Sequence, residues 1–254
     1  MMRTILCLFL LSSFVTTVSF AQETEFQKTY EQGKAVLAKK DYGQAIQHFT
    51  KASEIEPKNP EAYLKLIEAA IGKKDLAVYK RALTGLETIK YTKLDAAVYL
   101  AYGNIAKKQK QYKNSLDVID KGMQSFPENV DLLIMSASIY KKLNNNDEAI
   151  RKLSKAKGLS PNNVVVLADL GELYLQENKN RSQELFEQVV KLDPNHDLAL
   201  SALGMLYLRK YNIETTNNDA LKKAVSYYER YAKRHPNDNN VTKILENLYV
   251  LMEK

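Results

Sequence analysis

Three histidines and one cysteine are the side chains best suited to nucleophilic or metal chemistry, and they are widely scattered. None of the histidines, His48, His196 and His235, stands in a spacing of the HExxH type. The sequence also lacks the GxSxG, P-loop and GxGxxG motifs. Carboxylates such as Glu184 and Glu187 have a spacing typical of the solvated face of a helix. We therefore predict no catalytic residue, no metal site, no cofactor and no enzymatic activity.

The cysteine, Cys7, lies in an amino-terminal segment with the features of a signal peptide. Arg3 precedes an apolar run over residues 5–18, and small residues up to Ala21 occupy the positions that a signal peptidase recognises. A retained anchor is the alternative, but the run is short for a hydrocarbon layer of about 30 Å. We predict a signal peptide over residues 1–21 and a mature chain over 22–254 with no thiol and no membrane span.

Export without cysteine suits an oxidising compartment, because no thiol remains to be oxidised. We expect the periplasm, with secretion or attachment to the envelope as alternatives. The formal charge of +7 is a modest excess for 254 residues, which favours solubility over nucleic-acid binding. Nine glycines and six prolines, with 45% hydrophobic residues, favour a packed helical protein.

Five prolines mark an internal repeat, each preceded at fixed distances by a small and a bulky residue. The prolines are Pro57, Pro127, Pro161, Pro194 and Pro236. The small residues twelve positions earlier are Ala45, Ser115, Ala149, Ser182 and Ala224, and the bulky ones eight positions earlier are Phe49, Ile119, Leu153, Phe186 and Tyr228. Further upstream a second small position holds Gly33, Gly103, Ala137, Gly171 and Gly204. Two small residues let antiparallel helices cross closely, so each unit is predicted to be a helical hairpin.

Each proline closes one hairpin and leads into the next. Two residues after the prolines stand Asn59, Asn129, Asn163, His196 and Asp238, mostly side chains that cap helix N-termini. Such caps stabilise a helix by about 1 kcal/mol. The pattern, with small residues at repeat positions 8 and 20 and proline at 32, resembles the tetratricopeptide repeat of about 34 residues.

This resemblance implies an all-α, right-handed superhelical solenoid of about six hairpins plus a C-terminal capping helix. The repeats are expected near residues 26–59, 60–95, 96–129, 130–163, 164–196 and 197–238, followed by the capping helix at 239–253. The last segment places Val241, Ile244, Leu245, Leu248 and Leu251 on one helical face, as expected for a helix that covers an open solenoid end.

Two repeats depart from the pattern. Repeat two has Ile67 and Tyr79 where small residues belong, and no proline closes it after Ile89. Repeat six carries about eight extra residues over 211–218, which we predict to be a polar, exposed loop between its helices.

The resemblance also implies a binding face, because the first helix of each repeat lines the concave side with positions 2, 5, 9 and 12. Position 5 is apolar in the first four repeats, at Tyr30, Leu64, Leu100 and Ile134. Either this stripe is a peptide groove, or the neighbouring repeats cover it. The predicted partner-binding residues are Tyr30, Lys34, Leu64, Glu68, Leu100, Asn104, Lys107, Ile134, Ser138 and Lys141.

Lysines at positions 12 and 13 of two repeats, Lys107, Lys108, Lys141 and Lys142, would favour an acidic partner segment. Complementation of the helix dipole is the alternative reading of these lysines. The carboxylate clamp of similar proteins would need Lys and Asn at positions 5 and 9 of one repeat. Here Leu100 accompanies Asn104, and Tyr30 accompanies Lys34, so that activity is not expected.

The leading hypothesis is a non-catalytic scaffold or adaptor of the cell envelope that binds a segment of another protein. A second hypothesis is self-association into a homo-oligomer through repeat two and the final helix. A third is a small-ligand or enzymatic site walled by some of the sixteen tyrosines, which would require a deep, closed cavity.

Overall fold

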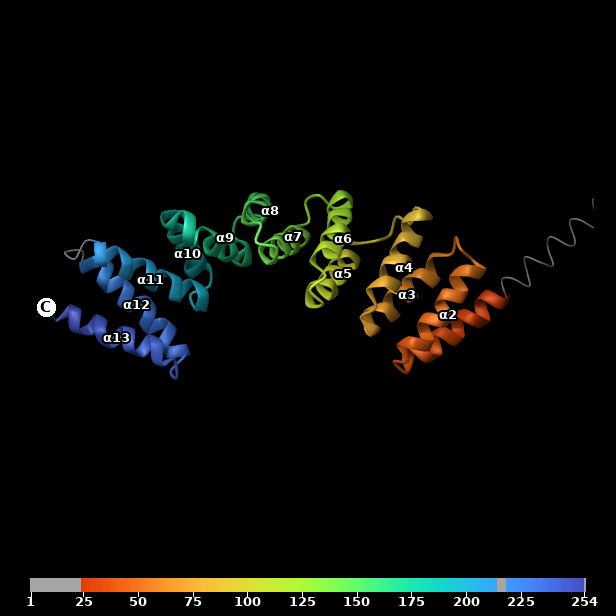
Figure 1. The fold of residues 1–254 in the computed structure, drawn as a ribbon, viewed down its shortest axis with the longest axis horizontal. Helices are drawn as coiled ribbons and strands as arrows, with labels where there is room; N and C mark the ends of the chain where they lie inside the picture. The colour runs from red at the N-terminus through yellow and green to blue at the C-terminus, as the bar shows by residue number, and fades with distance from the viewer. Residues whose placement is uncertain (1–23, 214–217, 254) are drawn as a thin grey trace, which may run out of the picture. The chain divides into compact units, whose positions relative to one another are not determined.

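A computed structural model describes residues 24–213 and 218–253, and these residues are helical with no strand among them (Figure 1). The first described helix covers residues 24–38. The helices that follow are α2 (Tyr42–Ile55), α3 (Pro60–Lys73), α4 (Leu76–Thr88), α5 (Ala96–Lys108), α6 (Tyr112–Ser125), α7 (Val130–Lys142), α8 (Asn146–Leu159), α9 (Val164–Glu177), α10 (Lys179–Leu192), α11 (Asp197–Ile213), α12 (Asn218–Arg234) and α13 (Asn239–Met252). The predicted all-α architecture of helical hairpins is confirmed. The predicted signal peptide lies outside the described residues.

Short polar side chains start the helices where the sequence placed them. The Asn129 and Asn163 side chains accept hydrogen bonds from the backbone amides of the first turns of α7 and α9. Asn59 and Asp238 cap α3 and α13 in the same way. His196 Nδ1 accepts from the Ala199 amide at 3.3 Å. These caps fix the direction in which each hairpin begins.

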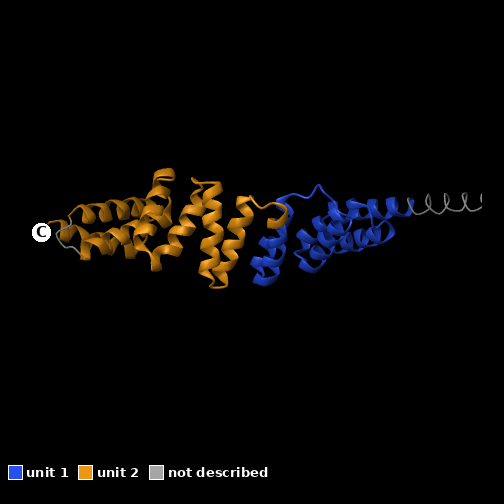
Figure 2. Ribbon diagram, turned by 90° about the horizontal axis from the view of Figure 1, so that it is seen from above, with its two compact units in different colours: residues 1–122 blue, residues 123–254 orange. Residues whose placement is uncertain are grey.

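The chain divides into two compact units, which are described separately (Figure 2). Unit 1 runs to Gly122 and contains the hairpin of helix 24–38 with α2, the α3–α4 hairpin, α5 and most of α6. Unit 2 begins at Met123, in the last turn of α6, and contains the hairpins α7–α8, α9–α10 and α11–α12, with α13 packed on α12.

The α9–α10 hairpin shows how small residues permit a close helix crossing. A Cβ atom added to Gly171 would lie 2.9 Å from ring atoms of Phe186, so only glycine fits without a shift of that ring. Ser182 Oγ donates a hydrogen bond to the Gly171 carbonyl at 2.7 Å. All three residues are buried, and Phe186 belongs to the apolar core of unit 2.

The α3–α4 hairpin lacks this crossing. Ile67 is 6% exposed and Tyr79 is fully buried, so both large side chains fill the positions that glycine and serine hold elsewhere. The Tyr79 hydroxyl donates to the Val98 carbonyl of α5, and its ring packs edge-on against Tyr102 with centroids 5.4 Å apart. Burial raises the pKa of Tyr79 well above its usual value, which keeps the hydroxyl protonated as a donor.

Four of the eight extra residues of repeat six belong to its helices, which corrects the prediction of an eight-residue loop. Residues 211–213 belong to α11, and Asn218 begins α12. Tyr211 is half-buried against the core of unit 2, which gives the chain a reason to continue the helix there. Residues 214–217 lie outside the described part of the chain.

Helix α13 buries an apolar face. Val241, Leu245 and Leu248 are at most 8% exposed, and Ile244 and Leu251 are partly buried against the same core. Across residues 24–213 and 218–253, no helix has the length and apolar character needed to cross a membrane.

Candidate functional site

Tyr30, predicted as part of the groove floor, is largely covered in unit 1. Its side chain is 8% exposed, and its ring stacks on Phe26 and meets Phe49 edge-on. Burial, together with the negative charge of Glu61, raises the pKa of Tyr30 to about 12. The hydroxyl therefore remains neutral at physiological pH, and Tyr30 offers a partner little apolar surface.

The other predicted residues of unit 1 lie on the first helices of their hairpins. Lys34 is exposed and pairs with Glu31 at 2.9 Å, while Glu68 pairs with Lys65 at 2.7 Å. Exposed pairs of this kind contribute about 0 to 1 kcal/mol and reorganise easily. The remaining predicted side chains are half-buried, except for the exposed Asn104; they are Leu64, Leu100 and Lys107.

In unit 2 the predicted residues lie on α7. The ammonium group of one of them, Lys141, forms ion pairs with the next hairpin. Its Nζ lies 2.8 Å from Asp169 Oδ1 and 2.5 Å from Glu172 Oε2, both on α9. Burial lowers the pKa of Lys141, but these two carboxylates outweigh burial and the net pKa is raised. Lys141 is thus a charged link between α7 and α9, the first helices of two consecutive hairpins. Ile134 and Ser138 are half-buried on α7.

Three exposed apolar side chains on α9 and α11 extend the predicted face. Val165 and Leu198 are 53% and 38% exposed and occupy position 2 of consecutive repeats, and Met205, at position 9, is 48% exposed. Positions 2 and 9 are also predicted to face the inner side, whereas the apolar pattern predicted from the sequence covers position 5 of the first four repeats. Reading positions 2 and 9 in the last two repeats would have found all three.

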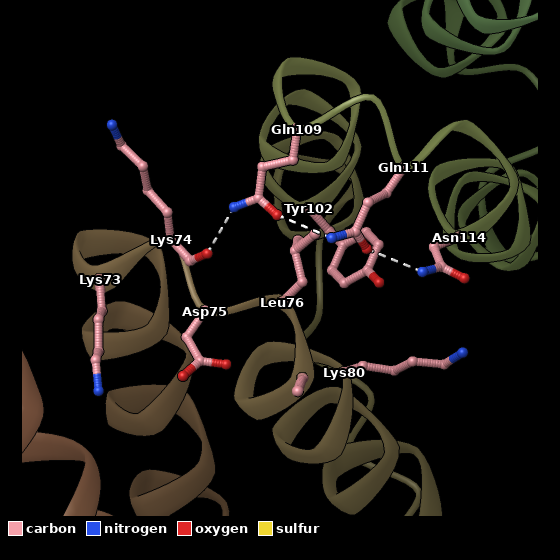
Figure 3. A pocket seen from close by; sticks show the side chains of 10 residues that line it. Lys73, Lys74, Asp75, Leu76, Lys80, Tyr102, Gln109, Gln111 and Asn114 are labelled. Carbon is pink, nitrogen blue, oxygen red and sulfur yellow. Dashed lines mark hydrogen bonds between the residues drawn. The ribbon is translucent and has the colours of Figure 1, made fainter.

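Unit 1 also contains a pocket at the hairpin turns, which the sequence analysis did not predict (Figure 3). It has a volume of about 580 Å³ and lies where the α3–α4 turn faces the α5–α6 turn. Its lining residues are Lys73, Lys74, Asp75, Leu76, Ala77, Lys80, Tyr102, Gln109, Gln111 and Asn114. The only sequence signal nearby is the irregular repeat two, whose Tyr79 packs on Tyr102.

Two smaller pockets lie elsewhere, one in each unit. The first, about 440 Å³, is bordered by α2, α3 and α4 and includes Tyr63 and Arg81. The second, about 280 Å³, includes Leu133 of α7 and Arg151 of α8. None of the pockets described here is walled by several tyrosines, as the third sequence hypothesis required. Within the described ranges, no group of three or more His, Cys, Asp or Glu side chains is arranged to hold a metal ion.

Comparison with known families finds models of the tetratricopeptide repeat in three parts of the chain. They match residues 36–105, 130–163 and 169–239. A search of curated protein sequences found no match.

Solved structures of similar fold include YrrB, pilF and MamA. YrrB, a TPR protein with an unusual peptide-binding site, is 23% identical with a TM-score of 0.59, and the match covers 78% of this chain and 97% of YrrB. The pilF protein of Pseudomonas aeruginosa is 16% identical with a TM-score of 0.56, over 89% of this chain and 99% of its own. MamA is 17% identical with a TM-score of 0.51, over 67% of this chain and 92% of its own.

Proposed function

Since the chain belongs to the tetratricopeptide repeat family, we propose that it is a non-catalytic protein-interaction scaffold whose unit 2 holds an apolar segment of another protein. The observation that carries this proposal is the exposure of Val165, Leu198 and Met205 on the inner helices α9 and α11. Two of the three occupy the same repeat position, so they recur along the face with the period of the hairpins.

Burial of these three side chains can contribute part of the free energy of binding of a complex of moderate affinity. Complete burial of one such side chain is worth about 1.5 to 3 kcal/mol, and roughly half of that remains available at a half-exposed position. Three positions thus offer on the order of 3 kcal/mol before the cost of association, so further contacts along the face are needed for micromolar binding. Ile134 of α7 and the backbone of the partner segment are candidates for those contacts.

The Lys141 network supports the same face. By linking α7 to Asp169 and Glu172 of α9, it holds the spacing of two inner helices before any partner arrives. A preformed surface lowers the conformational entropy lost on binding. YrrB, which has a similar fold, has a peptide-binding site, and this supports a peptide segment as the partner.

A binding selection tests the proposal. Peptides that bind the chain lacking residues 1–21 are selected from a random display library and then titrated against variants. Combined Val165→Asp, Leu198→Asp and Met205→Asp substitutions are expected to weaken binding by at least about tenfold, because partner side chains would meet charge. Unchanged affinity in this variant would refute the inner-face site.

The matched control introduces three aspartates at exposed leucines of unit 2 outside the inner faces of α9 and α11. These leucines are Leu143, Leu159 and Leu192, which are 38%, 40% and 43% exposed. The control variant is expected to bind within about twofold of the unmodified chain, since surface changes away from a contact are usually nearly neutral. An equal loss in both variants would indicate a general effect of charge.

Self-association is a second candidate, favoured by exposed side chains at the end of α13. Tyr249, Val250 and Met252 are 42%, 54% and 45% exposed. If they join two chains, the mass measured by light scattering should rise with concentration, and Val250→Asp should restore the monomer. A monomeric mass at every concentration would exclude this candidate.

We further propose that the scaffold works after export, in the periplasm or elsewhere in the envelope, on the basis of the predicted leader. Amino-terminal sequencing of the chain recovered from its own cells tests this proposal. A first residue at position 22 supports export, and an intact residue 1 in the cytoplasmic fraction contradicts it.

A further inference from the structure

The pocket at the hairpin turns of unit 1 carries a positive charge that the surrounding protein does not neutralise. Lys73 and Lys74 end α3, and Lys80 lies one turn into α4. Among the described residues, none of these three lysines is in an ion pair within 4.0 Å. Asp75 is the one carboxylate of the lining, and its Oδ1 caps α4 by accepting from the Val78 amide at 3.1 Å. The lining therefore has a net charge of about +2 at neutral pH.

Three side-chain amides form a row along one side of the pocket (Figure 3). Gln109 Nε2 donates to the Lys74 carbonyl at 2.9 Å, and Gln111 Nε2 donates to Gln109 Oε1 at 3.1 Å. Asn114 Nδ2 then donates to Gln111 Oε1 at 3.0 Å. The direction of the row follows from its first member, because a backbone carbonyl can only accept and so requires the NH₂ group of Gln109.

The amide row and the three lysines supply the pocket with hydrogen-bond donors. Each of the three NH₂ groups uses one hydrogen within the row and keeps a second hydrogen for another acceptor. Within the row, Gln109 Oε1 and Gln111 Oε1 each accept one hydrogen bond, and Asn114 Oδ1 accepts none. Three ammonium groups add further donors. The complementary ligand is an anion whose oxygens accept several hydrogen bonds.

The size and floor of the pocket favour a carboxylate carried by a peptide. A volume of about 580 Å³ admits an amino-acid side chain together with part of its backbone. Leu76 and Ala77 supply carbon surface for the aliphatic part of such a residue. Figure 3 shows the three lysine side chains extending from the rim in different directions. Because they are exposed and have flexible four-carbon stems, they can turn toward a bound carboxylate.

We propose that this pocket binds a carboxylate of an acidic peptide segment of a partner protein. None of its lining residues belongs to the inner face of unit 2, so the proposal is independent of the scaffold site there. The carboxylate comes either from an acidic side chain or from the C-terminus of the partner, and both sources satisfy the same donors.

Fluorescent peptides distinguish the two sources. The probes are a short oligoglutamate blocked at both ends, an oligoserine with a free C-terminal carboxylate, and a blocked oligoglutamine as the neutral reference. Each is titrated by anisotropy into the chain lacking residues 1–21 at low salt. Binding of the first probe identifies side-chain carboxylates, and binding of the second identifies the C-terminus. Shifts of the Gln109, Gln111 and Asn114 side-chain amides in NMR spectra are expected with the probe that binds.

A charge-removal variant tests the lysines. It combines Lys73→Gln, Lys74→Gly and Lys80→Gln; glycine suits position 74 because Lys74 has φ 58°. The variant is expected to weaken carboxylate binding by about tenfold or more. Lys80→Glu alone should weaken it in the same direction, which keeps the test valid if the combined variant folds poorly.

The matched control removes the same charge from the first repeat, through Lys39→Gln, Lys40→Gly and Lys58→Gln, where Lys40 has φ 60°. It is expected to change the affinity by less than about twofold. An equal loss in both variants, or no loss in the pocket variant, would overturn the proposal. So would a failure of both carboxylate probes to bind, even if inorganic phosphate binds. The Val165, Leu198 and Met205 variant should bind these probes normally, which separates this test from that of the scaffold face.

Discussion

The α9–α10 hairpin of unit 2 and the α3–α4 hairpin of unit 1 use opposite side chains at the point where their helices cross. In α9–α10, Gly171 and Ser182 bring the two helices together, and their hydrogen bond lies within the hairpin. In α3–α4, Ile67 and Tyr79 occupy the same repeat positions, and the polar contact of Tyr79 reaches Val98 in the next hairpin. One crossing stabilises its own hairpin, and the other joins two hairpins.

This difference links the irregular repeat to the pocket. Tyr79 packs on Tyr102, and Tyr102 in turn lines the pocket between the α3–α4 and α5–α6 turns. The loop from α4 to α5 spans residues 89–95, and it has no closing proline. The irregular repeat thus borders a polar recess, whereas the regular repeats of unit 2 present exposed apolar positions on the first helices of consecutive hairpins, α9 and α11.

Substitution of Tyr79 by the small residue typical of the family should give the largest effect. Tyr79 is fully buried, so Tyr79→Ala is expected to lower the free energy of unfolding by about 3 to 5 kcal/mol through loss of packing and formation of a cavity. Urea denaturation followed by circular dichroism measures the change. Tyr249→Ala, at a side chain that is 42% exposed, serves as the control and should cost about 1 kcal/mol or less. A stabilised Tyr79→Ala variant would show that the two crossings are equivalent.

Substitution by alanine should change the stability of the protein in opposite directions at two glycines, Gly171 and Gly158. Gly171→Ala is expected to cost about 1 to 3 kcal/mol, because the new Cβ would lie 2.9 Å from the Phe186 ring. Gly158→Ala in α8 places its Cβ where no atom lies within 4 Å, so it should stabilise the chain by up to about 1 kcal/mol. Thermal denaturation of the two variants shows whether each substitution lowers or raises the stability. Two changes of equal sign would contradict the close crossing at Gly171.

Removal of one hydroxyl from each hairpin should give the smallest loss of stability, but the two variants should differ in where hydrogen exchange becomes faster. Ser182→Ala and Tyr79→Phe each delete one hydrogen bond and should each cost about 0.5 to 1.5 kcal/mol. Hydrogen exchange locates the loss. Faster exchange is expected within α9 and α10 for Ser182→Ala, and in α5 as well as α4 for Tyr79→Phe. An effect of Tyr79→Phe confined to α4 would contradict its role in joining hairpins.

Much of the fold follows from the sequence because its signals are local. Prolines such as Pro161 end a hairpin, and a cap such as Asn163 begins the next helix two residues later. Small residues at Gly171 and Ser182 require a close crossing wherever the partner helix lies. The length of α11 was missed because the polar residues after Tyr211 read as a loop, while the burial of Tyr211 continues the helix.

The candidate sites were harder to predict because they depend on contacts between hairpins. Tyr30 and Lys141 have the right types and positions for a groove, and that assignment stays a prediction. Aromatic neighbours cover Tyr30, and α9 carboxylates engage Lys141. The side-chain amides of the pocket form a row because Gln109 donates a hydrogen bond to the Lys74 carbonyl of another hairpin. No spacing within one repeat encodes such a contact.

Hydrogen exchange of the chain with and without a bound peptide from the display selection tests the scaffold proposal most directly. We expect slower exchange in α9 and α11, around Val165 and from Leu198 to Met205, with little change in α10 and α12. Protection confined to the outer helices or to α13, with α9 and α11 unchanged, would contradict it.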